Sequence, residues 1–178
     1  VGIEINPMGL KIINAKVANA NYDKINEFLK WLSAKRFEKE KITDVDLFNN
    51  SDVWFRKDVR FKINNILQKI ENLDSVTKNF IEVGLSDHLK GISNAMMHRT
   101  IPTLPKSSKY IDRKHYDRPI DNETRKIDVY GRVLSQLRKM LFAIEYLNLR
   151  DGKVTATPIL GDSRNLIKHL NEKGIEEV

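Results

Sequence analysis

Two acidic residues lie where short apolar segments end, one near each end of this 178-residue chain. Glu4 closes the apolar run of "VGIEINP", and Asp162 follows the apolar "PIL" in "ILGDSRNL". A carboxylate just beyond a strand can accept hydrogen bonds from both hydroxyls of a ribose, and another could accept one from the exocyclic amino group of adenine. Ile5 could pack on an adenine face. In the structural alternative, each carboxylate caps the helix after it, and Ile5 belongs to the core.

The segment 97–126 carries a second kind of chemistry, because it is strongly basic. It holds eight Lys and Arg residues against four acids, a local net charge of +4, with Tyr110 and Tyr116 between them. Its basic residues are Arg99, Lys106, Lys109, Arg113, Lys114, Arg118, Arg125 and Lys126. Lys and Arg neutralise phosphates, and aromatic rings stack on unpaired bases, so the segment is a candidate DNA-binding loop. Its composition by itself favours the alternative, a solvated loop.

The two acids need strands to position them, and the hydrophobic pattern predicts a strand–helix unit at each end of the chain. Residues 1–5 are typical of a buried strand and residues 154–160 of a strand, and Pro7 suits the first turn of a helix. The closing "GIEEV" predicts the start of a further strand. In open α/β sheets ligands bind beyond the carboxyl ends of the strands, so the two acids could line one pocket.

Between these ends the apolar spacing is helical, so the chain is expected to be mostly α, with a central helical part flanked by the two strand–helix pieces. It predicts helices over about 22–38, 54–70, 75–92 and 127–144, and the polar stretch 39–51 predicts a loop. Asp52 and Asp74 precede two of these helices and are expected to cap them. Trp54 and Phe55 open an apolar helix, so we expect them in the core rather than as a stacking platform for bases.

The composition narrows the class of protein. Hydrophobic residues make up 40% and charged residues 31% of the chain, which is ordinary for a globular domain. No apolar run approaches the roughly 18 residues of a membrane span, and the absence of cysteine suits a reducing cytoplasm. The four histidines show no metal-ligand spacing, so no metal is expected. The net charge of +7 favours an anionic partner, nucleic acid before an acidic membrane.

"GIEINP", a long helical middle and "ILGDSRNL", in this order, resemble the S-adenosylmethionine-dependent DNA amino-methyltransferases of the restriction-modification type. The middle segments "DVWFRKDVRFKINNIL" and "FIEVGLSDHLKGISNAM" are similar to a helical insert that one subgroup carries between the two acids. The resemblance implies that Glu4 holds the cofactor ribose, that Ile5 packs on the adenine, and that Asp162 accepts from the adenine amino group. It also implies double-stranded DNA as partner and a Rossmann-like sheet at the two ends.

Two motifs of that family are absent from this sequence. The eight glycines never occur as G-x-G, so there is no glycine-rich cofactor loop, and there is no Pro-Pro of the catalytic motif. We therefore expect an internal piece of the enzyme, inactive by itself, that partners the missing N- and C-terminal parts of the core. Residues 1–20 and 151–178 would belong to the core and residues 21–150 to the insert. No catalytic residue is assigned, and adenine and cytosine stay open as target bases.

Three rival interpretations stay open. A standalone helical nucleic-acid-binding module without catalysis would use the basic segment but would need Glu4 and Asp162 only for stability. A structural protein would carry its basic face for solubility and would not bind DNA even at low salt. A piece of an RNA methyltransferase is the third, and it is disfavoured because the family resemblance ties the long helical insert to DNA methylases.

Overall fold

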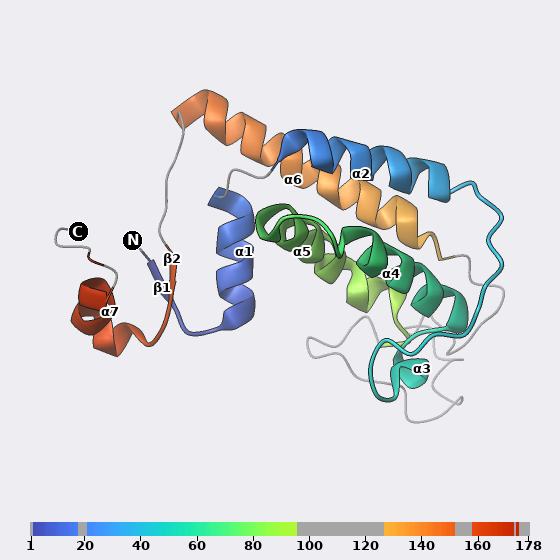
Figure 1. Cartoon of the computed structure of the whole chain (residues 1–178), viewed down its shortest axis with the longest axis horizontal. Helices are drawn as coiled ribbons and strands as arrows, with labels where there is room; N and C mark the ends of the chain where they lie inside the picture. The colour runs from blue at the N-terminus through green and yellow to red at the C-terminus, as the bar shows by residue number, and fades with distance from the viewer. Residues whose placement is uncertain (1, 18–20, 96–126, 152–157, 173, 175–178) are drawn as a thin grey trace, which may run out of the picture.

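The computed structural model describes residues 2–17, 21–95, 127–151, 158–172 and 174. The described part is mostly helical, as predicted (Figure 1). In chain order, its elements are β1 (Gly2–Glu4), α1 (Pro7–Val17), α2 (Tyr22–Lys35), α3 (Ser51–Trp54), α4 (Lys57–Ile70), α5 (Ser75–Ile92), α6 (Val129–Asp151), β2 (Pro158–Leu160), the 3₁₀ turn η2 (Ser163–Asn165) and α7 (Leu166–Glu172). The eight candidate DNA-binding residues and the predicted "GIEEV" strand fall outside the described residues, apart from Gly174.

Four helices form a bundle around one hydrophobic core. In Figure 1, α2 and α6 run side by side, and α4 and α5 pack against them. Each helix contributes side chains at helical spacing, so that one face of each is buried. Fully buried members include Ile25 and Leu32 of α2, Val59 and Ile66 of α4, Phe80 and Ile81 of α5, and Val133 and Leu137 of α6. Burial of these faces, more than intrinsic helix propensity, stabilises helices of this length.

Side-chain caps define where several helices begin. Asp74 caps α5 as predicted, since its Oδ1 accepts from the backbone N–H of Thr77 at 2.9 Å. Asn21 caps α2 in the same way through Lys24 N–H at 3.1 Å. Each cap satisfies one of the N–H groups that have no partner inside the helix.

The prediction of one helix that starts near Trp54 is wrong in one respect, because the structure has two helices there. The short α3 ends at Trp54, Phe55 is extended (φ −136°, ψ 139°), and α4 begins at Lys57. Asp52 therefore lies in the first turn of α3 and caps nothing in α4. The break turns Phe55 inward, where it is 7% exposed and its ring meets the Phe48 ring edge-on at 6.3 Å. The core placement of Phe55 is confirmed, and Trp54 packs half-buried against the same core.

The two ends of the chain meet in a parallel pair of strands. Gly2 lies opposite Pro158, Ile3 opposite Ile159, and Glu4 opposite Leu160. The pair stands apart from the bundle in Figure 1, with α1 between them. This is the strand direction of a Rossmann-like sheet, but the residues that the structure describes supply two strands only. The larger sheet stays a prediction.

Candidate functional site at the strand ends

The parallel pairing brings Glu4 and Asp162 to the same edge of the strand pair. Glu4 is the last residue of β1, and Asp162 follows β2 by two residues. Between them, the backbone N–H of Gly161 donates to the carbonyl oxygen of Glu4 at 3.1 Å, which continues the pairing one step beyond the strands. Two carboxylates from opposite ends of the chain therefore lie where a parallel sheet binds its ligands.

Glu4 already serves the start of α1. Its Oε1 accepts from the backbone N–H of Asn6 at 2.8 Å, and Asn6 in turn caps the helix through Met8 N–H at 2.9 Å. The carboxylate lies over Gly9, where an added Cβ would be 2.8 Å from Glu4 Cδ. Only a residue without a side chain leaves room for the carboxylate in this position. Glu4 therefore holds the residue that caps α1 and does not cap the helix itself, and its half-buried side chain leaves it reachable by a ligand.

Ile5 does not belong to the core. Its side chain is 68% exposed just beyond the end of β1, so the alternative that placed it in the interior is wrong. An exposed isoleucine beside a carboxylate at a strand end can cover the face of a flat ring.

Asp162 is held by its neighbour Arg164. Its Oδ1 accepts from the backbone N–H of Arg164 at 2.9 Å, and Nε of the guanidinium donates to the two carboxylate oxygens at 3.0 and 2.8 Å. These hydrogen bonds lower the pKa of Asp162 below its ordinary value, so the carboxylate is ionised at neutral pH. The Arg164 side chain is 86% exposed, and an exposed ion pair of this kind is easily exchanged for another partner.

The structure adds His169, a residue that the sequence pattern did not single out. Its imidazole lies against Gly161, where an added Cβ would be 2.4 Å from Nε2. Nε2 is buried and has no hydrogen-bond partner among the described residues, and Nδ1 lies 3.6 Å from Glu172 Oε2. The only signal in the sequence is a glycine at the strand end eight positions before a histidine. That pattern is too common to identify the contact.

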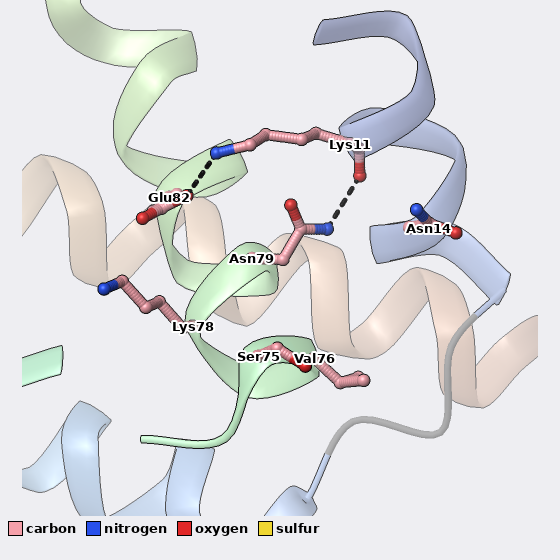
Figure 2. A pocket seen from close by; sticks show the side chains of 7 residues that line it. All are labelled: Lys11, Asn14, Ser75, Val76, Lys78, Asn79 and Glu82. Carbon is pink, nitrogen blue, oxygen red and sulfur yellow. Dashed lines mark hydrogen bonds and ion pairs between the residues drawn. The ribbon is translucent and has the colours of Figure 1, made fainter. Parts of the chain in front are cut away.

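A hollow lies between α1 and α5, where the strand–helix unit packs against the bundle (Figure 2). It has a volume of about 540 Å³. Lys11 Nζ lies 2.6 Å from Glu82 Oε2, and Asn79 donates through Nδ2 to the carbonyl oxygen of Lys11 at 2.9 Å. Glu4, Ile5 and Asp162 do not line it, and Lys11 bonds across the two helices to Asn79 and Glu82. We interpret this hollow as part of the packing between α1 and α5 and not as a ligand site.

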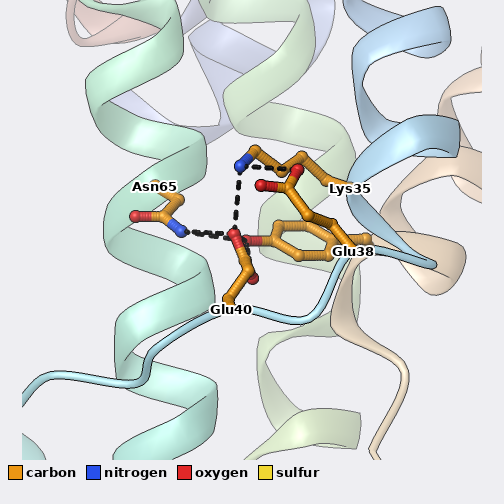
Figure 3. Close-up of polar contacts among 5 residues, drawn as sticks. Lys35, Glu38, Glu40 and Asn65 are labelled. Atoms are coloured by element: carbon orange, nitrogen blue, oxygen red, sulfur yellow. Dashed lines mark hydrogen bonds and ion pairs between the residues drawn. The ribbon is translucent and has the colours of Figure 1, made fainter.

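A second polar group, missed by the sequence analysis, lies where the 36–50 connection crosses the bundle (Figure 3). The buried Tyr130 hydroxyl donates to the Glu40 carboxylate, 3.0 Å from Oε2, and accepts from Asn65 Nδ2 at 3.0 Å. Asn65 also donates to Glu40 Oε1 at 3.1 Å, and Lys35 Nζ lies 3.3 Å from the same oxygen. Burial raises the pKa of Tyr130, so the hydroxyl keeps its proton and remains a donor.

Some kinds of site find no support in the part of the chain that the structure describes. It holds no group of three or more His, Asp or Glu side chains placed to bind a metal ion. None of its helices is both long enough and apolar enough to cross a membrane. No protein-family model matches the chain, and neither a curated protein nor a solved structure matches it.

Proposed function

We propose that this chain is part of a DNA methyltransferase that transfers a methyl group from S-adenosylmethionine to an exocyclic amino group of adenine or cytosine. The observation that supports this most is the parallel pairing of β1 with β2. It brings Glu4 and Asp162, the two acids that the family resemblance assigns to the cofactor, to one sheet edge. Residues this far apart in the sequence have no local reason to meet there.

The groups at this edge fit the nucleoside half of the cofactor. Glu4 presents a carboxylate for the two ribose hydroxyls, and the ionised Asp162 presents one for the adenine amino group. The exposed Ile5 can cover the adenine ring. When the adenine amino group binds Asp162, Arg164 would lose some of its hydrogen bonds to that carboxylate. The cofactor supplies an activated methyl group, and nothing among the described residues is assigned to its methionine half.

The exposed surface of the strand–helix unit supports the proposal that further parts of the core complete it. Parallel sheets are normally covered on both faces, and two strands alone are marginal. Here Met8 and Ile12 of α1 are 46% and 37% exposed, and Leu160 of β2 is 50% exposed. In the proposed enzyme the missing N- and C-terminal parts of the core cover these side chains. They also contribute the glycine-rich loop and the catalytic motif, so this chain alone methylates nothing.

Double-stranded DNA is the proposed substrate. Enzymes that modify a base take it out of the helical stack, so the protein must also hold the surrounding duplex. The net charge of +7 and the basic segment 97–126 supply the cations for that contact.

Reading the coding DNA on both sides of this segment is the first test. We expect an open frame with a glycine-rich strand–loop before Val1 and a Pro-Pro-aromatic motif after Val178.

Cofactor binding to the whole protein would then be measured by calorimetry for Glu4→Ala and Asp162→Ala. Each loses a charge-assisted hydrogen bond, so we expect affinity to fall about tenfold to a hundredfold. Glu27→Ala, an exposed α2 residue, is the control. Flanks without these motifs, or unchanged affinity, would refute the proposal.

One observation favours a second candidate, a helical nucleic-acid-binding module without catalysis. Glu4 and Asp162 each accept a backbone N–H two residues further along the chain, which is sufficient to explain both acids structurally. The bundle also has its own core. In this case Glu4→Ala and Asp162→Ala lower stability and leave nucleic-acid binding unchanged.

A further inference from the structure

A basic hollow lies on the bundle, away from the strand ends. It is formed by α2, by the connection at residues 38–41 and by one face of α4, and its volume is about 560 Å³. Lys35, Glu38, Glu40 and Asn65, drawn in Figure 3, all line it. On the α4 side, Phe61, Asn65, Gln68 and Lys69 follow one another at helical spacing, so they share a face.

The walls of this hollow are held by the polar group around Tyr130. The Glu40 side chain is only 8% exposed, because its carboxylate turns inward to Tyr130, Asn65 and Lys35. This anchors a connection that has no helix or strand of its own. The lysines that flank Glu40 are therefore presented from an ordered backbone.

The charges in the hollow divide into two sets. Lys35 is already paired, since its ammonium lies 2.9 Å from the Glu38 carboxylate and 3.3 Å from the Glu40 carboxylate. Lys39, Lys41 and Lys69 are exposed and have no ion-pair partner within the described ranges. Three lysines without an ion-pair partner among the described residues thus surround the hollow. Its two acids, Glu38 and Glu40, are already neutralised in part by Lys35.

Trp31, one of the two aromatic side chains that line the hollow, is not free to stack on a ligand. Trp31 stacks on Phe28 with ring centroids 5.3 Å apart and meets the Tyr130 ring edge-on at 5.9 Å. Its ring is part of the core packing. A base would therefore find no open ring at Trp31, whereas a chain of phosphates would find ammonium groups and the exposed amide of Gln68.

We infer that Lys39, Lys41 and Lys69 form a contact surface for the phosphodiester backbone of a nucleic acid. The lysines come from two elements and surround an open hollow, so they can contact successive phosphates of one strand without reading bases. The inference does not rest on the proposed methyltransferase function, because it uses neither Glu4 nor Asp162. It gives the described bundle its own part in the binding of nucleic acid.

The test compares two triple variants of the full chain with equal loss of charge. Lys39→Ala/Lys41→Ala/Lys69→Ala removes the surface, and Lys16→Ala/Lys30→Ala/Lys139→Ala removes three exposed lysines of α1, α2 and α6 that do not line the hollow. Fluorescence anisotropy measures binding to a DNA duplex and an RNA duplex of about 20 base pairs, at several salt concentrations from roughly 50 to 200 mM. Circular dichroism confirms that both variants fold.

We expect the first variant to bind at least about fivefold more weakly than the control variant, with a salt slope smaller in magnitude by up to about 3. A loss on both duplexes means that the shared backbone is bound, and a loss on one duplex identifies the nucleic acid that is bound. Equal weakening in the two variants would overturn the inference, because net charge alone would then explain binding. Failure of the unmodified chain to bind either duplex at low salt would overturn it as well.

Discussion

A single residue is expected to contribute most to stability where its buried hydrogen bond joins segments that lie far apart in the sequence. Tyr130→Phe keeps the ring of Tyr130 in the core but removes the hydroxyl that donates to Glu40. The Glu40 carboxylate, 8% exposed, is then short of a donor, so we expect unfolding to become easier by about 1–3 kcal/mol. Urea denaturation measures the change. Tyr146→Phe, at a side chain that is 55% exposed, is the matched control and should change little. Equal effects of the two variants would show that the hydroxyl of Tyr130 contributes nothing special.

The side-chain cap of α5 is expected to make the stability of the fold depend on pH in the acid range. The Thr77 N–H, and then Lys24, lower the pKa of Asp74 from 3.8 to about 2. A carboxyl with a depressed pKa in the folded state stabilises the fold above its unfolded pKa and loses that effect as the pH falls through the folded value.

Asp74→Asn isolates the charge, because the amide oxygen can still cap the helix. We expect the melting temperature of Asp74→Asn to lie below that of the unmodified protein above about pH 4 and the two to converge toward about pH 2. Thermal melts across this range measure the gap. A gap that stays constant with pH would mean that the charge of Asp74 is not responsible for it.

At the scale of elements, the close approach of α5 to α6 depends on one glycine. A Cβ added at the buried Gly84 would lie 2.5 Å from Cδ2 of Leu137, a side chain that is itself fully buried. Gly84→Val therefore forces the two helices apart or Leu137 out of its rotamer, and we expect a loss of about 1–3 kcal/mol in the free energy of unfolding. Asp87→Val places the same residue at an exposed position of α5 and serves as the control. A loss no larger than that of the control would mean that the packing at Gly84 tolerates the added volume.

At the scale of the whole molecule, the net charge of +7 underlies the proposal of a nucleic-acid partner. If the basic segment 97–126 contacts DNA, Arg113→Ala/Lys114→Ala/Arg118→Ala should weaken binding to a duplex. It should also flatten the dependence on salt by up to about 3 in slope, since each lost cation releases about one counterion fewer. Anisotropy titrations at several salt concentrations measure both. The control is the triple variant of Lys16, Lys30 and Lys139 described above. Unchanged affinity would remove this segment from the interface.

Much of the local structure is determined by the sequence itself. The helical spacing of apolar residues predicted α2, α5 and α6, Pro7 predicted the start of α1, and Asp74 predicted the cap of α5. These features are visible in the sequence because apolar residues three or four positions apart share one helix face, and because caps and helix starts depend on the residues next to them. The break at Phe55 was missed, because the inward turn of that ring depends on core partners elsewhere in the chain.

Only the tertiary structure decided which distant residues meet. The pairing of β1 with β2 brings Glu4 beside Gly161 and Asp162, the approach of α7 to the strand end sets His169 on Gly161, and the inward turn of Glu40 joins it to Tyr130. Local periodicity carries no information about such contacts, since each depends on the path of the chain between its partners. The sequence therefore determined the types of group and the elements that carry them, and packing of the whole chain determined which of these groups form a site.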